Sequence, residues 1–352
     1  MTTAVHQFHP VLAQGDAMSN HVFALRDRLR GWGYQSDAYA LEAKPGVDAL
    51  SYRRLFRVVK PGDTLILHFS IGSEIFDQLV KIPARRVLVY HNVTPAEFFT
   101  GINDHAAAYA RLGLRQVASL ADRIDLAIGV SEFNRKDLEA MGYRRTAHVP
   151  VLIDWKTYDV APDQATLARW SPIARKLLFV GRVSPNKRQD DLLRMFAYYR
   201  RCVDGEAHLL LVGGHRDQPQ YYARLRELQR ALGLESAATF TGPVSTAALV
   251  AYYRQASCFV SLSEHEGFGI PLLEAMRFDV PVVAYGAGAV TETVDGAAIV
   301  LAKRDLAEAA EACGVAVEDR ALRSQLVTAG RARLAAFDTE VVAARTREVL
   351  EL

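Results

Sequence analysis

Short apolar segments alternate with amphipathic helical patterns along the whole sequence, and this alternation constrains the fold more than any other feature. Val22, Leu25 and Leu29, for example, recur at helical spacing, and a glycine at position 31 closes their segment. The apolar segments are nearly continuous, which is typical of parallel strands covered by helices on both faces. The predicted strands are Ala4–Phe8, Ser36–Leu41, Thr64–Phe69, Val87–Tyr90, Asp125–Val130, Ala147–Leu152, Leu177–Val180, His208–Val212, Thr239–Thr241, Ser257–Leu262, Pro281–Tyr285 and Ala298–Leu301.

The strands fall into two strings, which predict two doubly wound α/β domains. A length of 352 residues fits two domains of ordinary size. The strings are separated near Asp154–Pro172, a polar stretch with two prolines and no strand pattern. We therefore expect domains at residues 1–160 and 161–336, followed by a helical tail at 337–352. Ligands of such sheets bind beyond the carboxyl ends of the strands, so the expected site is a cleft where the two sets of strand ends face each other.

Composition and charge exclude several classes of protein. Lys and Arg total 42 against 40 Asp and Glu, so the net charge of +2 gives no support to nucleic-acid binding. The three cysteines are isolated, which favours a reducing compartment over a disulfide scaffold. The first ten residues lack the pattern of a signal peptide, and no apolar run approaches the roughly 20 residues that span a bilayer. These features predict a cytoplasmic protein.

The most specific motif is E-G-F-G-x-P-x-x-E, which begins at Glu266 and ends at Glu274 directly after a predicted strand. The glycines allow close backbone approach, and the proline suits the first turn of a helix. The N-terminus of such a helix offers free N–H groups to an anion such as a phosphate. The two carboxylates suit hydroxyl-rich groups such as a hexose and a ribose. The alternative is a glycine-containing turn with two solvated glutamates.

This motif resembles the retaining glycosyltransferases of family 4, which have the GT-B fold. The family signature of two glutamates separated by seven residues corresponds to Glu266 and Glu274, and PVVAYGAGAVTETV (Pro281–Val294) matches the strand and glycine-rich turn that follow. Upstream, FVGRVSPNKRQDDLLRMF (Phe179–Phe196) resembles the first strand–loop–helix unit of the family's second domain. The resemblance covers Leu177–Leu352 and implies a C-terminal helix that crosses back to the first domain, an acceptor-side domain, and a donor domain for the nucleotide sugar.

The resemblance also implies the roles of individual residues. Arg182 and Lys187 would hold the diphosphate of the donor, for which a guanidinium and an ammonium are chemically suited. Gly242–Val244 would contact the nucleobase through the backbone. The catalytic residues implied in this way are Glu266, Arg182, Lys187 and His91. The donor-binding residues implied are Gly15, Val244, Gly267, Phe268, Gly269, Ile270 and Glu274.

The N-terminal half matches the family less closely. The family's glycine-rich loop after the first strand is represented by Gly15 alone, so a phosphate contact and a plain tight turn both remain open. His91, just past a predicted strand, resembles the histidine that faces the donor sugar, with a buried structural histidine as the alternative. His68 also ends a strand and is a candidate for acceptor contact together with Ser70, Ser73 and Glu74. Ser131 is expected to cap a helix.

The segment Tyr52–Lys60 combines four basic residues with apolar ones. Membrane-associated members of the family use such basic amphipathic segments to contact anionic lipid, so peripheral contact with the inner face of a membrane is one interpretation. The other is an ordinary solvated basic face.

The predicted function is a retaining, metal-independent transfer of a hexose from a nucleotide diphosphate sugar to a saccharide, lipid-linked or small-molecule hydroxyl. The resemblance favours GDP-mannose slightly and leaves UDP-sugars open. No cofactor is expected, and no cluster in the sequence has the spacing of a zinc site. The alternatives are an epimerase or phosphorylase on the same fold, or a nucleotide-sugar binding protein without turnover. A nicotinamide dehydrogenase is disfavoured because G-x-G-x-x-G is missing after the first strand.

Overall fold

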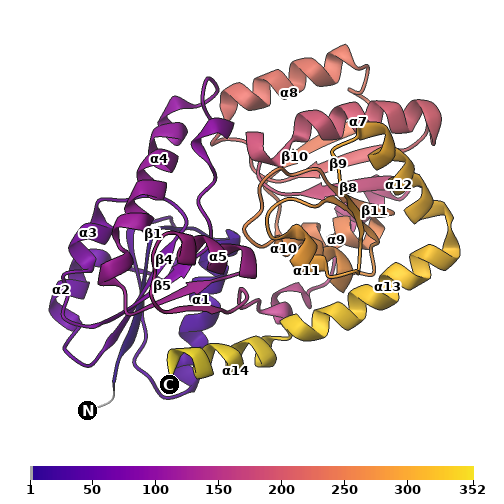
Figure 1. The fold of residues 1–352 in the computed structure, drawn as a ribbon. Coiled ribbons are helices and arrows are strands. Elements are labelled where there is room, and N and C mark those ends of the chain that lie inside the picture. The colour runs from indigo at the N-terminus through magenta and orange to yellow at the C-terminus, as the bar shows by residue number, and fades with distance from the viewer. Residues whose placement is uncertain (1–2) are drawn as a thin grey trace. The chain divides into compact units, whose positions relative to one another are not determined.

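Two parallel sheets organise the chain, as the alternation of apolar runs predicts. The computed structural model describes residues 3–352. The first sheet has the strand order β3-β2-β1-β4-β5-β6-β7 and the second β10-β9-β8-β11-β12-β13 (Figure 1), and every pair of neighbouring strands is parallel. The fold class predicted for the two domains is therefore confirmed.

The strand positions agree closely with the apolar runs. The strands are β1 (Val5–Leu12), β2 (Ala38–Ala43), β3 (Leu50–Ser51), β4 (Thr64–Phe69), β5 (Arg85–Tyr90), β6 (Leu126–Gly129), β7 (Thr146–His148), β8 (Lys176–Val180), β9 (His208–Val212), β10 (Ala238–Gly242), β11 (Cys258–Ser261), β12 (Val282–Tyr285) and β13 (Ile299–Leu301). The edge strand β3 was not predicted, because two residues at a sheet edge carry no apolar pattern. The predicted strand Ala147–Leu152 is wrong beyond His148, where only the Val149 amide continues the pairing.

Helices connect successive strands in both sheets, except between β2 and β3. The α-helices are α1 (Ala17–Gly31), α2 (Leu55–Val58), α3 (Ile75–Leu79), α4 (Asp104–Ser119), α5 (Glu132–Ala140), α6 (Gln164–Trp170), α7 (Gln189–Cys202), α8 (Pro219–Ala231), α9 (Thr246–Gln255), α10 (Ile270–Arg277), α11 (Val290–Val294), α12 (Leu306–Glu318), α13 (Arg320–Leu334) and α14 (Thr339–Leu350). Short 3₁₀ turns at Tyr52–Arg54, Trp155–Tyr158 and Pro185–Lys187 matter for the arguments below. None of the helices formed by residues 3–352 is long and apolar enough to cross a bilayer.

The chain divides into two structural units. The first holds the described residues up to Thr100, then Asp104–Trp155 and Phe337–Leu352, and the second holds Gly101–Asn103 and Lys156–Ala336. The division at Trp155 lies a few residues before the predicted boundary at 160, because the 3₁₀ turn Trp155–Tyr158 already belongs mainly to the second unit.

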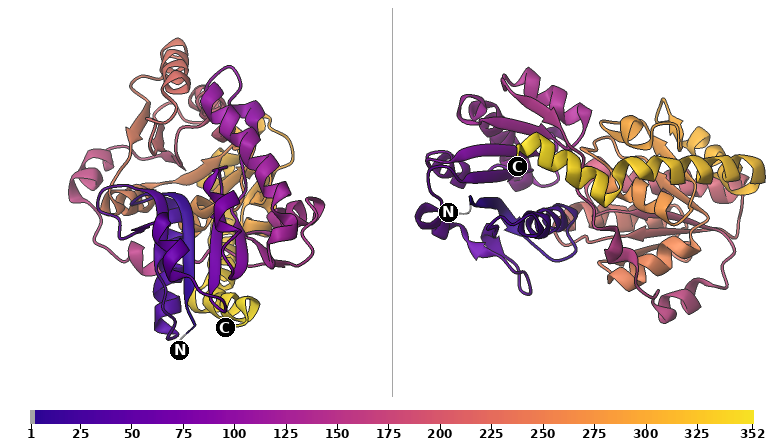
Figure 2. Two further views of the ribbon diagram at one scale, coloured as in Figure 1. Left: turned by 90° about the vertical axis from the view of Figure 1, so that its left-hand side faces the viewer. Right: turned by 90° about the horizontal axis from the view of Figure 1, so that it is seen from below.

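The C-terminal helix α14 is part of the first unit, as predicted for the tail. Figure 2 shows α14 (yellow) beside the indigo N-terminal elements. Glu340 of α14 accepts hydrogen bonds from the guanidinium of Arg28 on α1. At the other end, Arg85 on β5 donates to the carbonyl of Leu350, and Arg145 pairs with Glu351. Helix α14 is thus bonded to both the start and the middle of the unit.

Both faces of each sheet are covered, as the continuous apolar strands predict. In the first unit, Leu65, Leu67 and Phe69 of β4 belong to a core that includes α3 and α4. A separate cluster of Leu12, Val22, Ala38 and Ala40 packs α1 against the sheet. In the second unit, alternate residues of β8 and β9 pack with α7 and α12. The carboxyl ends of the strands carry the loops that form the candidate sites.

Candidate functional site

In the second unit, the candidate site lies at the point where the strand order reverses. Strands β8, β9 and β10 extend the sheet in one direction, and β11, β12 and β13 extend it in the other. The loops after β8 and β11 therefore diverge to opposite sides, and such a switch point is where open α/β sheets bind ligands. Arg182 and Lys187 follow β8, and Glu266 follows β11.

The loops after β8 and β11 are joined by two hydrogen bonds. Glu264 donates its amide to the carbonyl of Asn186 (2.9 Å), and the Asn186 side chain donates to the carbonyl of His265 (3.1 Å). Asn186 is itself buried and accepts a hydrogen bond from Ser184. This double attachment places Lys187 beside Glu266.

Lys187 and Glu266 form an ion pair at the centre of the candidate site. The Lys187 ammonium lies 2.6 Å from a carboxylate oxygen of Glu266, and the two side chains are 19% and 13% exposed. Two residues predicted to be catalytic from separate motifs are thus in direct contact. An anion bound here would compete with the Glu266 carboxylate for the Lys187 ammonium, so Lys187 can exchange its carboxylate partner for an anionic ligand.

The glycine-rich turn after β12 supports Glu266 from the other side. The Ala289 amide donates to the carbonyl of Glu266 (2.9 Å), and the Thr293 hydroxyl donates to the carbonyl of Phe268 (2.6 Å). Gly288 has a φ of 57°, and a Cβ atom there would lie 2.4 Å from the Glu266 carbonyl oxygen. Only glycine allows this approach.

We expect Gly288→Ala to lower the free energy of unfolding by more than about 2 kcal/mol. The left-handed conformation alone costs a non-glycine residue about 1–2 kcal/mol, and the clash with the Glu266 backbone adds to that cost. Gly296→Ala is the matched control, because Gly296 also has a positive φ of 80° but has no neighbour within 4 Å of its Cβ position. Urea unfolding of both variants measures the difference, and equal losses would contradict the close approach.

The helix that follows Glu266 begins without a side-chain cap. Gly269 is the N-cap of α10 with a φ of 95°, and Pro271 stands in the first turn. Phe268 is 7% exposed and anchors the turn, while Gly267 and Ile270 are half-buried. The uncapped N-terminus leaves backbone N–H groups and the positive end of the helix dipole at the candidate site. Both features favour an anionic ligand.

Arg182 is exposed, in contrast to Lys187. Its backbone is fixed, because its carbonyl accepts a hydrogen bond from the Gln189 side chain (3.0 Å) and the next amide, that of Val183, donates to Gly214 (2.7 Å). Within residues 3–352 the Arg182 guanidinium has no ion-pair partner. Among the described residues, the loop after β8 thus carries one cation without an ion-pair partner, Arg182, and two paired cations, Lys187 and Arg188.

Glu274 is buried inside the second unit and already has two hydrogen-bond donors. Its side chain accepts from the hydroxyl of Tyr253 (2.6 Å) and from that of Tyr158. Burial raises the pKa of the Glu274 carboxyl, although the two phenols oppose this shift. A ribose could bind this carboxylate only if it displaced a tyrosine. Tyr158 is the more accessible of the two, because it is half-buried whereas Tyr253 is fully buried.

The loop after β10 holds the predicted nucleobase contact. Gly242 has a φ of 72°, and its carbonyl accepts from the Gly213 amide (3.2 Å), which joins the loops after β9 and β10. Val244 is half-buried, and Ser245 caps α9. The backbone around Val244 therefore stands at the same edge of the sheet as the Lys187–Glu266 pair.

In the first unit, Gly15 occupies a tight turn between β1 and α1 with a φ of 76°. The next residue, Asp16, caps α1: its carboxylate accepts from the Ser19 amide (2.9 Å) and from the Ser19 hydroxyl. A phosphate at this helix terminus would meet a carboxylate of the same charge. The geometry around Gly15 therefore favours the turn over a phosphate contact.

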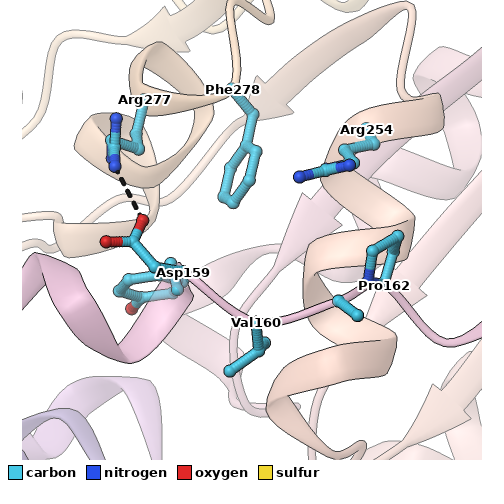
Figure 3. A pocket seen from close by; sticks show the side chains of 8 residues that line it. Asp159, Val160, Pro162, Arg254, Arg277 and Phe278 are labelled. Carbon is cyan, nitrogen blue, oxygen red and sulfur yellow. Dashed lines mark hydrogen bonds and ion pairs between the residues drawn. The ribbon is translucent and has the colours of Figure 1, made fainter.

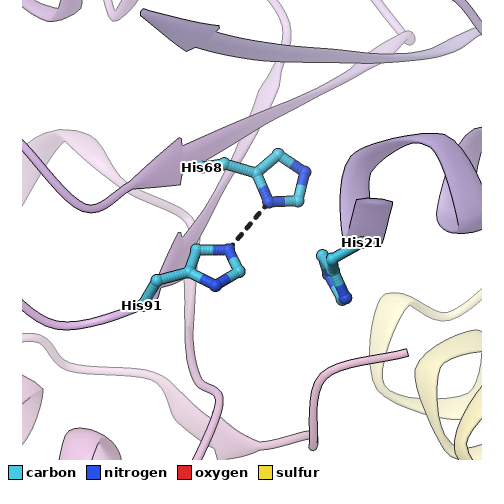
Figure 4. A group of neighbouring side chains, drawn as sticks. All are labelled: His21, His68 and His91. Carbon is cyan, nitrogen blue, oxygen red and sulfur yellow. Dashed lines mark hydrogen bonds between the residues drawn. The ribbon is translucent and has the colours of Figure 1, made fainter. Parts of the chain in front are cut away.

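His91 lies at the carboxyl end of β5 and is half-buried within a histidine cluster (Figure 4). His68 Nδ1 lies 3.1 Å from His91 Nε2, and nitrogen atoms of His21, His68 and His91 all lie within 4.8 Å of one another. Burial lowers the pKa of all three imidazoles. His68 is fully buried, so the expectation that it contacts an acceptor directly is wrong.

Of the other residues predicted after β4, Ser70 and Ser73 have structural partners. Ser70 bonds to His9 Nε2 (2.9 Å), and the Ser73 backbone is held at both its amide and its carbonyl by the Gln116 side chain. Glu74 is exposed. Ser131 caps α5 by accepting from the Asn134 amide, as predicted.

The sequence did not identify Gln7, His21 or Tyr158 as neighbours of these residues. The signal for Gln7 is its polar side chain inside the otherwise apolar strand β1. His21 lies on the buried face of α1, where a histidine is unusual. No feature of the sequence around Tyr158 indicates a contact with Glu274.

A pocket of about 510 Å³ lies elsewhere in the second unit (Figure 3). It is lined by Tyr158, Asp159, Val160, Ala161, Pro162, Arg254, Arg277 and Phe278. Arg277 and Asp159 form an ion pair across it (3.0 Å). Tyr158 and Phe278 of its lining bond to Glu274, but none of the predicted donor-binding residues lines the pocket, so it is not the predicted donor site.

Comparison with known proteins supports the assignment of the second unit. Residues 171–333 match the family model described as glycosyl transferases group 1. A D-inositol 3-phosphate glycosyltransferase of Kineococcus radiotolerans is 30% identical over 222 residues, which cover 60% of this chain and 49% of that protein. A GDP-mannose-dependent alpha-(1-6)-phosphatidylinositol monomannoside mannosyltransferase of Mycobacterium tuberculosis is 34% identical over 161 residues, or 43% of this chain and 40% of that protein. The chain thus spans half or less of the length of these relatives.

Solved structures match the whole chain. The HepE protein of Anabaena, in complex with UDP and glucose, has a TM-score of 0.78 and 17% identity, with 99% of each chain covered. Sucrose-phosphate synthase of Thermosynechococcus elongatus has a TM-score of 0.78 and 19% identity, covering 99% of this chain and 98% of that one. These neighbours confirm the predicted GT-B fold class.

Proposed function

We propose that the protein is a retaining glycosyltransferase that moves a hexose from a nucleotide diphosphate sugar to a hydroxyl group. The observation that carries the proposal is the Lys187–Glu266 pair at the switch point beside the uncapped N-terminus of α10. The segment that contains both features matches group 1 glycosyltransferases. The acceptor is proposed to be a saccharide, a lipid-linked sugar or a small alcohol.

In the proposed mechanism, positive charge stabilises the departing nucleotide diphosphate. Arg182 and Lys187 bind its oxygens, and the N–H groups at Gly269–Ile270 bind it through the helix terminus. The acceptor attacks from the face that the diphosphate leaves, and a phosphate oxygen takes the acceptor's proton, so configuration is retained and no protein nucleophile is required. Glu266, released from Lys187, binds hydroxyl groups of the hexose.

The nucleoside is proposed to bind along Val244, Gly267 and Phe268, with its ribose hydroxyls on Glu274 in place of Tyr158. Gly15 is left out of this set, because the carboxylate of Asp16 occupies the adjacent helix terminus. His91 is proposed to contact a hydroxyl of a sugar substrate. GDP-mannose and UDP-glucose are both candidate donors, since one relative is named as GDP-mannose-dependent and a structural neighbour was solved with UDP-glucose.

A panel of nucleotide sugars tests the proposal. The matching donor at 100 times its Kd is expected to stabilise the protein by about 2.7 kcal/mol, measured as a thermal shift, and to yield a glycosylated product with the correct acceptor. Saturable binding without product would indicate a binding protein, and conversion of the free donor to its epimer would indicate an epimerase. No response to any nucleotide sugar would contradict the proposal.

Transfer is expected to need no divalent metal. Arg182, Lys187 and the start of α10 supply the positive charge that a metal ion would otherwise provide. Activity measured in excess EDTA should therefore equal activity with Mg²⁺ or Mn²⁺. Loss of activity in EDTA that either metal restores would contradict this scheme.

Peripheral membrane contact is proposed for the segment Arg53–Lys60. Its basic residues are all exposed, and so are Phe56 (47%) and Val58 (36%), while Leu55 and Val59 anchor it in the core. Exposed apolar side chains beside cations are the combination that binds an anionic lipid surface.

The combined variant Arg53→Gln/Arg54→Gln/Arg57→Gln is expected to weaken binding to anionic vesicles about 100-fold, at about 1 kcal/mol for each cation. Co-sedimentation with vesicles of phosphatidylcholine and phosphatidylserine measures this loss. The control carries the same change at three exposed arginines of the second unit, Arg201, Arg216 and Arg230. Equal loss in both variants, or no binding by the unmodified protein, would leave the segment an ordinary solvated face.

A further inference from the structure

The histidine cluster of the first unit stands where the order of its sheet reverses. Strands β1, β2 and β3 extend the sheet one way, and β4 to β7 extend it the other. Gln7 belongs to β1, His68 to the neighbouring β4, and His91 follows β5. His21 comes from α1, with its ring 5.3 Å from those of both His68 and His91. The spacing of the three histidines resembles that of a metal site, but their hydrogen bonds fix the ring protons in a way that does not suit a metal ion.

The hydrogen bonds of Gln7 determine which nitrogen of His68 carries the proton. The Gln7 amide nitrogen donates to the carbonyl of Val22 (3.1 Å), so its oxygen faces His68. That oxygen lies 2.9 Å from His68 Nε2 and can only accept, so Nε2 carries the hydrogen. In a neutral ring, Nδ1 of His68 is then a lone-pair acceptor. Burial, together with the neighbouring histidines, lowers the pKa of His68 and keeps the ring neutral.

The same reasoning extends to His91. His68 Nδ1, as an acceptor, lies 3.1 Å from His91 Nε2, which must therefore donate. The remaining nitrogen, His91 Nδ1, is left with a lone pair. Within residues 3–352 it accepts no hydrogen bond, and it is not one of the enclosed atoms without a partner. The atom is therefore not fully enclosed by the described residues.

The backbone around His91 is fixed as firmly as its ring. The His91 amide donates to the carbonyl of Phe69 (2.9 Å), which continues the β4–β5 ladder. The next residue, Asn92, has a φ of 75°, and its side chain donates to Asn134 (2.7 Å). The position of the His91 ring is thus set from the backbone and from His68 together.

His21 is unsuited to a metal ion. The amide of Leu152 donates to His21 Nδ1 (2.8 Å), so a neutral His21 carries its hydrogen on Nε2 and has no second lone pair to offer. Coordination through Nε2 would require a proton on Nδ1, pointing at the Leu152 N–H. The hydrogen bonds therefore assign the ring protons of the cluster. His91 Nδ1 keeps a lone pair, and His21 does not complete a set of metal ligands.

We propose that Gln7 and His68 are positioning residues that hold His91 as the Nε2–H tautomer, so that His91 Nδ1 accepts a hydrogen bond from a hydroxyl group of a sugar substrate. The tautomer follows from the first unit alone. Its role at a sugar rests on the proposed function. Gln7 and His68 touch no substrate in this scheme and act only through His91.

The test reads the tautomers directly by two-dimensional ¹H–¹⁵N NMR of the imidazole rings in the full-length protein. At pH 7, His68 and His91 are expected to show a protonated Nε2 and an unprotonated Nδ1. Gln7→Met removes the acceptor at similar side-chain length and is expected to give mixed tautomers at both rings. Gln7→Glu retains an acceptor oxygen and is expected to restore the Nε2–H form of His68. Gln116→Met, a change at another buried glutamine of this unit, is the control and should leave both tautomers unchanged.

Kinetics test the second step. With the donor identified, Gln7→Met is expected to raise the KM of the sugar substrate about fivefold, the size of one hydrogen bond, with a smaller change in kcat. An Nδ1–H signal on His91 of the unmodified protein, or unchanged tautomers in Gln7→Met, would overturn the proposal. So would stoichiometric Zn²⁺ binding that shifts His21, His68 and His91 together. If the tautomers are as stated but no nucleotide sugar is a substrate, the proposed function fails and the tautomer assignment stands.

Discussion

Lys187→Ala is expected to reduce the rate of glycosyl transfer more than tenfold while leaving affinity for the bare nucleoside unchanged. The substitution removes a cation from the leaving diphosphate and also leaves the Glu266 carboxylate, 13% exposed, without its partner. That uncompensated negative charge would then lie beside a departing anion, so the two effects act in the same direction. Steady-state kinetics with the matching donor, and calorimetric titration with the nucleoside, measure the two quantities.

Three further variants isolate the contribution of charge. Arg182→Ala is also expected to lower turnover more than tenfold, because it removes the free cation of the same loop. Lys187→Ala/Glu266→Gln removes both charges of the pair and is expected to recover nucleotide diphosphate affinity relative to Lys187→Ala. Arg230→Ala, at the exposed end of α8, is the control. Full turnover in either cation variant, or loss of nucleoside binding as well, would contradict the roles of Arg182 and Lys187.

The free energy of unfolding is expected to fall steeply as the pH drops from 7 to 5. Burial lowers the pKa of His9 and of His21 to about 4, and it holds those of His68 and His91 well below 6.5. The unfolded chain, with ordinary imidazoles, binds protons below pH 6.5 that the folded protein does not. Stability is therefore complete above pH 6.5 and is lost below it, by about 2 kcal/mol at pH 5 for each of His9 and His21, and His68 and His91 add to the loss in the same direction.

A pair of glutamine variants tests this assignment. His21→Gln offers the Leu152 amide an acceptor that does not titrate, so the pH slope of stability should decrease by about 1.2 kcal/mol per unit between pH 6 and 5. His105→Gln, at an exposed position of α4, should leave the slope unchanged. Urea unfolding at several pH values measures both. Stability that stays level between pH 7 and 5 would show that the cluster is protonated in the folded protein.

The strands and loops of the second unit were predicted more accurately than those of the first, because the residues that mark its strand ends are neighbours in the sequence. An apolar run followed by a glycine, a proline or a charge is a complete description of a strand end, so the loops of Lys187 and Glu266 could be placed at one edge of a sheet from neighbouring residues alone. Their direct contact was not predicted, because it depends on β8 and β11 being neighbours in the sheet. The two-residue strand β3 escaped detection, because so short an edge strand has no period.

Long-range side-chain contacts could not be predicted in this way. Tyr158 reaches Glu274 from a 3₁₀ turn more than a hundred residues earlier, and nothing in either motif specifies that approach. Likewise, Gln7 and His68 meet because β1 and β4 are neighbours with a particular register, in which Gln7 pairs with Ile66. A polar residue in an apolar strand indicates that a partner exists, but the partner is identified only when the register is known.

Helix α14 has a consequence for the order in which the protein can be made. It belongs to the first unit, where it bonds to Arg28 and Arg85, yet it is encoded after the whole of the second unit. When the first 155 residues have left the ribosome, α14, which bonds to this unit, has therefore not yet been translated. The second unit, in contrast, is formed by one continuous segment, Lys156–Ala336, together with Gly101–Asn103, and all of these residues are translated before α14. The unit that is translated first therefore receives α14 only after the whole of the second unit has been translated.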